Sequence, residues 1–194
     1  MRKHSNNGAS ALMKTLSDAG VDTCFTNPGT SEMHFVAALD GSDMREVLCL
    51  FGGVATGAAD GYARIANKPA ATLLHLGCGL SNGLANLHNA RKARVPMVNI
   101  VGAHAIYHKQ YDAPLESNIE TVVRNVSSWI RTCSSTERIG ADAAEAIEVA
   151  YKAPQQISTL ILPADVSWGE GAIAKEADLS AVTDIATAAL ITQI

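Results

Sequence analysis

Residues 70–102 have the sequence AATLLHLGCGLSNGLANLHNARKARVPMVNIVG, and this stretch decides the fold. Its first part, residues 70–76, is typical of a strand and runs into a glycine-rich turn at residues 77–79. Apolar residues return at helical spacing over residues 80–94. Residues 97–102 then form a continuous apolar run, as in strands that are covered on both faces. The stretch therefore predicts a β-α-β unit.

The same alternation extends along the rest of the chain. Further strands are expected at residues 21–25, 129–132 and 157–162, and a buried strand at residues 47–51. Further helices are expected at residues 9–19, 30–39, 54–66 and 136–151. Thr30 or Ser31 is the expected N-cap of the second of these helices, and Thr136 that of the last. This pattern predicts an α/β fold, a doubly wound and mostly parallel sheet with helices on both faces.

The composition argues against several classes of protein. The 194 residues carry a net charge of −4 and no long run of lysine and arginine, so neither nucleic acid nor an anionic membrane surface is an expected partner. No run of about 18 apolar residues is present, and residues 1–7 become polar where a signal peptide would become apolar. The four cysteines are widely spaced without a Cys-x-x-Cys pair. We therefore expect a soluble, cytoplasmic protein without a disulfide framework or a zinc knuckle.

Residues 1–170 are expected to form one domain. After Trp168 the sequence becomes a linker of small residues, and helical spacing of apolar residues resumes at residues 179–194. Two interpretations of residues 171–194 remain open. They form either a linker with a C-terminal docking helix or a linker with the start of a truncated central domain.

Three segments that follow predicted strands are unusually rich in glycine and polar residues. They are residues 26–32, 51–53 and 75–79. Because ligands of such sheets gather beyond the carboxyl ends of the strands, we expect these segments to converge on one edge and to form a site. Glycines there would let the backbone approach a ligand closely. His75 closes a buried strand at this edge and is either a structural histidine or one that contacts substrate.

Other motif matches near this edge are rejected. Residues 79–83 fit G-x-S-x-G, but no Asp or Glu lies between Ser81 and His108, and no histidine follows His108. Glycines 77, 79 and 83 match a dinucleotide fingerprint only loosely, without the acidic residue about 20 positions later. His104 and His108 have metal-ligand spacing, but they lie in an expected loop with no carboxylate before Asp112. We therefore predict no metal site.

Residues 57–64, with the sequence GAADGYAR, are the strongest family motif of the chain. Together with NPGTSE at 27–32 and HLGCGLSN at 75–82, they resemble the N-terminal pyrimidine-binding domain of thiamine-diphosphate enzymes. Acetolactate synthase large subunits and benzoylformate decarboxylase look most similar. Residues 161–166, ILPADV, resemble the end of the last strand of this domain. The resemblance covers about residues 8–168.

The resemblance implies half of a cofactor site. In this family thiamine diphosphate bridges two subunits, so it implies a homodimer or a higher homo-oligomer. This domain holds the aminopyrimidine, whereas a separate domain binds the diphosphate through Mg²⁺ with a Gly-Asp-Gly pattern that is absent here. That domain would belong to the full-length protein or to a partner chain. The cofactor-binding residues that the resemblance implies are Asn27, Pro28, Gly29, Gly52, Thr56, Gly77, Cys78 and Asn82.

Two further positions match residues that act on substrate in benzoylformate decarboxylase. Thr30 matches a substrate-contacting serine, and His75 matches a catalytic histidine. Cys78 replaces the usual proline or alanine, and we expect it to pack against its neighbours.

The activating glutamate of the family is missing. In the family it hydrogen-bonds a pyrimidine nitrogen and promotes removal of the thiazolium proton. Alignment on residues 59–62 places this glutamate at Gly52, which cannot accept or share a proton. Gly52 is then an engineered knockout, a natural degenerate copy, or a feature of enzymes that work without this carboxylate. Glu46 is the next acid, but we expect it at the opposite end of the sheet.

Two functions follow from this resemblance. The leading hypothesis is the aminopyrimidine half-site domain of a 2-oxo acid decarboxylase or carboligase, inactive as an isolated chain. A variant places the diphosphate-binding domain on a second polypeptide. The alternative is a catalytically silent homologue or fragment that serves as an assembly or regulatory partner.

Overall fold

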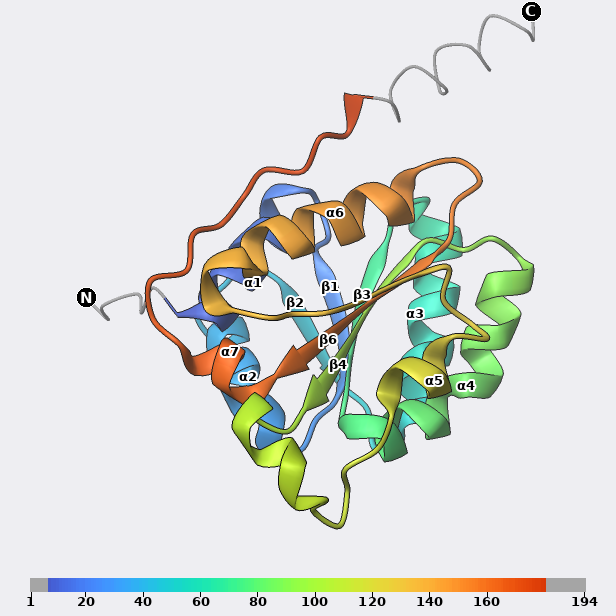
Figure 1. Cartoon of the computed structure of the whole chain (residues 1–194). Coiled ribbons are helices and arrows are strands. Elements are labelled where there is room, and N and C mark those ends of the chain that lie inside the picture. The colour runs from blue at the N-terminus through green and yellow to red at the C-terminus, as the bar shows by residue number, and fades with distance from the viewer. Residues whose placement is uncertain (1–6, 181–194) are drawn as a thin grey trace, which may run out of the picture.

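A single six-stranded parallel sheet organises the computed structural model, which describes residues 7–180 (Figure 1). The strands lie in the order β2-β1-β3-β4-β6-β5, and every neighbouring pair is parallel. Their bounds are Thr23–Asn27 for β1, Arg45–Leu48 for β2, Ala70–Leu74 for β3, Met97–Ala103 for β4, Trp129–Thr132 for β5 and Ile157–Pro163 for β6. The predicted doubly wound α/β fold is confirmed.

Helices cover both faces of this sheet. One face packs against α1 (Gly8–Asp18), α2 (Met33–Leu39), α6 (Ile139–Tyr151) and α7 (Ala164–Trp168). The other packs against α3 (Gly52–Ala66), α4 (Leu76–Lys92) and α5 (Ile119–Val123). Three short 3₁₀ helices complete residues 7–180: η1 (Thr30–Glu32), η2 (Ile106–Tyr111) and η3 (Thr136–Arg138).

The central strands separate two apolar cores. Every residue of β3, β4 and β6 is buried, as expected for strands with helices on both sides. Leu73 belongs to the core under α1 and α6, whereas Leu74 belongs to the core under α3 and α4. Residues 97–102 are therefore apolar because helices cover both faces of β4.

Several predicted boundaries are wrong. The expected buried strand at 47–51 is β2, Arg45–Leu48, which is mostly exposed because it lies at the edge of the sheet and has one neighbour. Helices α3 and α4 begin at Gly52 and Leu76, so their glycines are helical instead of forming loops. Thr136 begins η3 and its hydroxyl donates to the carbonyl of Val166, so it is not the N-cap of α6.

A polar ladder crosses the middle of the sheet. The hydroxyl of Thr72 on β3 donates to Asn99 Oδ1 on β4 over 2.7 Å, and Asn99 Nδ2 donates to Thr159 Oγ1 on β6 over 3.2 Å. All three side chains are fully buried. Each hydrogen bond compensates the removal of these polar groups from water, so Asn99 interrupts the predicted apolar run without an unpaired group.

The family motif at residues 57–64 lies in α3, and its tyrosine anchors this helix to the amino end of β1. The Tyr62 hydroxyl donates to Asp22 Oδ1 over 2.6 Å, and Lys68 pairs with the other oxygen of Asp22. Burial raises the pKa of Asp22, but the hydrogen bonds from Lys68 and Tyr62 outweigh it and leave this pKa below its ordinary value. Tyr62 thus acts structurally, at the end of the sheet remote from the carboxyl edge.

Residues 171–179 run without regular secondary structure along α1 and α6 (Figure 1). The amide of Lys175 donates to Thr15 Oγ1 over 3.1 Å, and that of Asp178 to Glu148 Oε1 over 2.8 Å. The helix predicted at residues 179–194 lies outside the described residues from 181 onward. The boundary at residue 170 remains a prediction.

No helix of residues 7–180 combines the length and the apolar character that crossing a bilayer requires.

All four cysteines are free thiols, and burial raises the pKa of Cys133 to about 12. Among the described residues, no group of three or more His, Cys, Asp or Glu side chains is placed to hold a metal ion.

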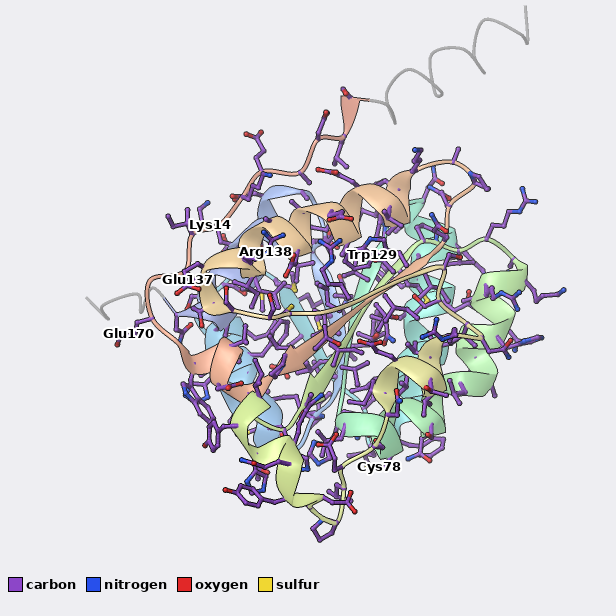
Figure 2. The ribbon with its side chains drawn as sticks, viewed as in Figure 1. Lys14, Cys78, Trp129, Glu137, Arg138 and Glu170 are labelled. Atoms are coloured by element: carbon purple, nitrogen blue, oxygen red, sulfur yellow. The ribbon has the colours of Figure 1, made fainter. Side chains whose placement is uncertain are left out.

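An arginine at the far edge of the sheet ties β5 to α6. Arg131 pairs with both carboxylate oxygens of Glu145 and, over 3.1 Å, with the buried carboxylate of Asp142. Its guanidinium lies 5.0 Å from the ring centroid of Trp129, which Figure 2 labels beside α6. Burial raises the pKa of Glu145, but the hydrogen bonds from Trp129 and Arg131 outweigh it and lower this pKa.

Replacing Arg131 by leucine should lower the free energy of unfolding by about 2–3 kcal/mol, because Asp142 would be left buried with only Arg138 at 3.7 Å. The loss is smaller than for a fully buried pair because a third of the Arg131 side chain is exposed. Urea denaturation measures this effect. Because the pKa of Glu145 is lowered, its contribution is present above its ordinary pKa and is lost as the pH falls, so the effect of the substitution should shrink in acid. Arg64→Leu, which removes an exposed pair with Asp60, is the control and should hardly change the midpoint.

Candidate functional site

The three segments that were predicted to converge do meet at the carboxyl edge of the sheet. They follow β1, β2 and β3, which are neighbours in the order β2-β1-β3. The side chain of Asn27 donates to the carbonyl of Cys49 over 2.9 Å, which joins the first segment to the residues between β2 and the second segment. Gly29 lies directly against the ring of His75, and Gly52 against the carbonyl of Gly79. Together these contacts connect the three segments to one another.

The glycines at this edge serve packing within the protein. A β-carbon on Gly52 would lie 2.6 Å from the carbonyl oxygen of Gly79, and one on Gly29 would overlap the His75 ring. A β-carbon on Gly77 would overlap the hydroxyl of Ser117. Protein atoms therefore fill the β-carbon side of each of these glycines, and the approach of their backbone to a ligand stays a prediction.

Glycines and small polar residues join α3 and α4 in what we call the α3–α4 seam: Gly52, Gly53, Thr56, Gly57, Gly79, Asn82, Gly83 and Asn86. The hydroxyl of Thr56 is within hydrogen-bonding distance of the carbonyls of Gly52, Gly53 and Gly83. Asn86 Nδ2 donates to the carbonyl of Gly53 over 2.7 Å. Thr56, which was predicted to bind cofactor, is fully buried in this seam with its hydroxyl already engaged.

His75 and Glu32 form a pair that sequence reasoning missed. His75 Nδ1 lies 2.8 Å from Glu32 Oε2, and the amide of Gly29 donates to the same oxygen over 2.7 Å. The Glu32 side chain is fully buried, whereas 21% of the His75 side chain is exposed. Two sequence features pointed to Glu32: it belongs to the motif at residues 27–32, and it lies three residues after Gly29, the spacing of a capping box.

Gly102 of β4 makes room for this buried carboxylate. A β-carbon on Gly102 would overlap Glu32 Oε1, and among residues 7–180 this oxygen has no hydrogen-bond partner. Burial of an unpaired carboxylate oxygen is costly, so the carboxylate depends on the two donors at its other oxygen. The pair is therefore held from three strands: Glu32 follows β1, His75 follows β3 and Gly102 belongs to β4.

The remaining predicted site residues lie on the outside of this edge. Thr30 is exposed as the first residue of η1, and Asn82 is exposed on α4 beside Gly52. Pro28 is partly buried. Cys78 is exposed at the start of α4, where Figure 2 labels it, so the expectation that it packs against neighbours is wrong.

Glu46 is not placed to replace the missing carboxylate. It lies within β2 and was expected at the opposite end of the sheet, but its carboxylate accepts a hydrogen bond from Thr26 Oγ1, one residue before the end of β1. It is in register with Cys24, whose side chain belongs to the core under α1. Paired residues of neighbouring strands point to the same face of the sheet, so Glu46 lies on the face that α1 covers. Gly52 and α3 lie on the other face.

Exposed apolar side chains surround the carboxyl edge. Of the twelve large hydrophobic residues that are exposed among residues 7–180, ten lie between Met33 and Val54, between Ile106 and Leu115, or at Trp168. We call these ten the apolar rim: Met33, Leu48, Leu50, Phe51, Val54, Ile106, Tyr107, Tyr111, Leu115 and Trp168. Leu50 is 94% exposed.

The two histidines with metal-ligand spacing belong to this rim region. The rings of His104 and His108 lie 5.6 Å apart between centroids, and His108 also contacts the rings of Tyr107 and Tyr111. Ser81, the serine of the rejected G-x-S-x-G match, donates to the carbonyl of Gly77 within α4. Neither feature contributes a catalytic arrangement.

Comparison with known proteins gives consistent results. The family model described as "Thiamine pyrophosphate enzyme, N-terminal TPP binding domain" matches residues 6–124. The chain is 67% identical to the "Putative acetolactate synthase large subunit IlvX" of Mycobacterium tuberculosis over 86% of this chain and 32% of that protein. It is 29% identical to the benzoylformate decarboxylase of Pseudomonas aeruginosa over 89% of this chain and 32% of that enzyme.

Among solved structures, the thiamine diphosphate-dependent 4-hydroxybenzoylformate decarboxylase of Rhodococcus jostii RHA1 superposes with a TM-score of 0.81. It shares 23% identity over 86% of this chain and 31% of that one, which supports the fold. The chain spans about a third of the length of the curated relatives named above.

Gly52→Ala should lower the free energy of unfolding by about 1–3 kcal/mol, because its methyl group would meet the backbone of Gly79 and force the α3–α4 seam apart. Gly61→Ala is the matched control in the same helix, since open space surrounds Gly61 and alanine favours helices by about 0.5–1 kcal/mol. Thermal or urea denaturation of both variants measures the two effects. Equal tolerance of the two substitutions would contradict the seam.

Proposed function

Because the chain belongs to the thiamine pyrophosphate enzymes, through their N-terminal TPP binding domain, we propose that its carboxyl edge is the aminopyrimidine half of a thiamine diphosphate site. The observation that carries this proposal is the meeting of residues 27–29, Gly52 and residues 75–79 at one edge. The proposed enzyme decarboxylates a 2-oxo acid or joins its acyl group to an acceptor.

The residues of this edge fit the binding of the pyrimidine ring. The first turns of α3 and α4 have no side-chain caps, so their amides are available as donors to ring atoms. His75 adds a partly exposed imidazole. When bound, thiamine diphosphate supplies the electron sink that a 2-oxo acid needs in order to lose carbon dioxide. The chain's own residues orient the ring, and His75 holds or moves a proton at Nε2.

The same edge does not fit the family's usual activation. Gly52 stands where we align the activating glutamate, and the α3–α4 seam leaves no space for a β-carbon there without movement of Gly79. Loss of a positioned acid or base typically lowers a rate by about 10²–10⁴-fold. The proposed enzyme is therefore slow, or it obtains the proton acceptor elsewhere.

The rest of the site is proposed to come from a second protein surface. The sequence holds no Gly-Asp-Gly, so Mg²⁺ and the diphosphate would be bound by a domain of the full-length protein or of a partner chain. The apolar rim supports this proposal, because a partner that covers it would also exclude water from the edge. We propose a homodimer or a higher homo-oligomer as the arrangement that brings the halves together.

A second candidate function is that of a silent assembly or regulatory partner. The observation that favours it is the seam, in which the place of the glutamate is filled by packed backbone. Gly52→Glu in the complete enzyme separates the two candidates when its unfolding is measured alongside. Recovered 2-oxo acid turnover by a folded variant favours the enzyme, whereas a folded variant without turnover favours the silent partner.

The half-site predicts that the 194-residue chain binds thiamine and thiamine diphosphate with Mg²⁺ equally weakly, because the diphosphate meets no residue of this chain. The two dissociation constants should agree within about threefold, a difference well below 1.4 kcal/mol. Titration followed by amide NMR shifts measures both constants. Shifts should be confined to residues 27–31, 52–54 and 75–79, while Asp22 and Lys68 at the opposite end serve as the control.

Tighter binding of thiamine diphosphate by tenfold or more would contradict the half-site, because the chain would then hold the diphosphate itself. Shift changes that avoid the carboxyl edge would contradict the ring site.

A further inference from the structure

We propose that Glu32 is a positioning residue that fixes His75 as its Nδ1–H tautomer, so that Nε2 presents a lone pair at the carboxyl edge. The catalytic use of that lone pair rests on the proposed function. The tautomer itself does not, because it follows from contacts within this chain.

The geometry assigns the proton to Nδ1. Glu32 Oε2 lies 2.8 Å from His75 Nδ1, and an ionised carboxylate can only accept hydrogen bonds. Because Oε2 already accepts the amide of Gly29, we infer that it accepts from His75 as well and that Nδ1 carries the hydrogen. In a neutral imidazole the other nitrogen, Nε2, is then an acceptor. His75 is partly exposed, so this acceptor belongs to the side of the ring that solvent or a ligand reaches.

The surroundings hold the carboxylate in one place. Gly29 donates its amide to the same oxygen and lies against the imidazole ring, which limits movement of both side chains. On the other side, Gly102 leaves only the space of a missing β-carbon for Glu32 Oε1. Because the Glu32 side chain is already confined, it loses little further conformational entropy when it orients His75. A positioning residue acts in this way.

The unpaired Oε1 is the second observation that points to a role beyond stability. A fully buried carboxylate with one oxygen unpartnered is an expensive way to fill space, and a leucine or methionine would fill it at lower cost. Such exceptions to hydrogen-bond pairing require an explanation in terms of function or strain. Here the carboxylate gives His75 an acceptor that no apolar residue could provide.

This pair differs in kind from the carboxylate that is missing at Gly52. Glu32 is fully buried behind the imidazole, so it reaches a ligand only through His75. His75 is therefore the group that would touch substrate or cofactor, and Glu32 sets which of its nitrogens is basic. A base of defined tautomer remains at this edge although position 52 offers none.

The test is the tautomer of His75 in the chain labelled with ¹⁵N-histidine, read from long-range ¹H–¹⁵N NMR correlations up to a pH of about 9, above the ordinary titration range of histidine. The Nδ1–H form should exceed the Nε2–H form by about tenfold or more, as expected for a hydrogen bond to a charged acceptor. Exposed His88 is the internal reference. A His75 ring that carries its proton on Nε2, or stays doubly protonated throughout, overturns the proposal.

Three substitutions separate positioning from simple packing. Glu32→Gln keeps an acceptor oxygen for His75 and should keep the Nδ1–H tautomer, whereas Glu32→Ala should lose that preference. Gly102→Ala should also lose it, because its methyl group displaces the carboxylate without changing its charge. An unchanged tautomer in folded Glu32→Ala overturns the proposal. If the variants do not fold, the wild-type measurement still decides it.

The outcome is independent of the thiamine titration. Failure of the chain to bind thiamine would remove the proposed function and leave the tautomer as measured. An Nε2–H tautomer would remove the positioning role while the ring site could still bind thiamine.

Discussion

The close approach of α3 and α4 is the constraint on which the rest of the candidate site depends. At Gly52 and Gly79 the two helices touch through backbone atoms, and Thr56 bridges them by hydrogen bonds to carbonyls of both. Because α3 follows β2 and α4 follows β3, this contact fixes the relative positions of the segments that end both strands. His75, the N-cap of α4, is thereby set against Gly29 and Glu32 on the segment that follows β1.

The fold could be predicted wherever both faces of an element are covered. Residues 97–102 and 157–162 are apolar because β4 and β6 lie between two layers of helices, and both strands were found within one residue. At β2 the prediction failed because an edge strand has one neighbour and exposes most of its side chains. The starts of α3 and α4 were missed for a different reason. Glycine disfavours helices by itself, and here the packing of the seam overrides that preference.

The site was predictable in place but not in its contacts. Parallel strand order alone brings residues 27–29, 52 and 75–79 to one edge, so the convergence followed from the fold class. The pairing of Glu32 with His75 depends on the adjacency of β1 and β3 and on a side chain buried in η1, neither of which has a periodic sequence pattern. The packing of protein atoms against these glycines was not predicted, because a glycine motif does not tell whether protein or ligand occupies the space beside it.

The family motif at residues 57–64 has a consequence for how such chains are recognised. Tyr62 serves the anchoring of α3 at the amino end of β1, through Asp22 and Lys68, and takes no part in the carboxyl edge. Selection can preserve this anchor for stability alone, even in lineages whose chemistry has been lost. A match to Tyr62 in this motif therefore indicates that the fold is kept. It does not indicate whether the protein still converts a substrate.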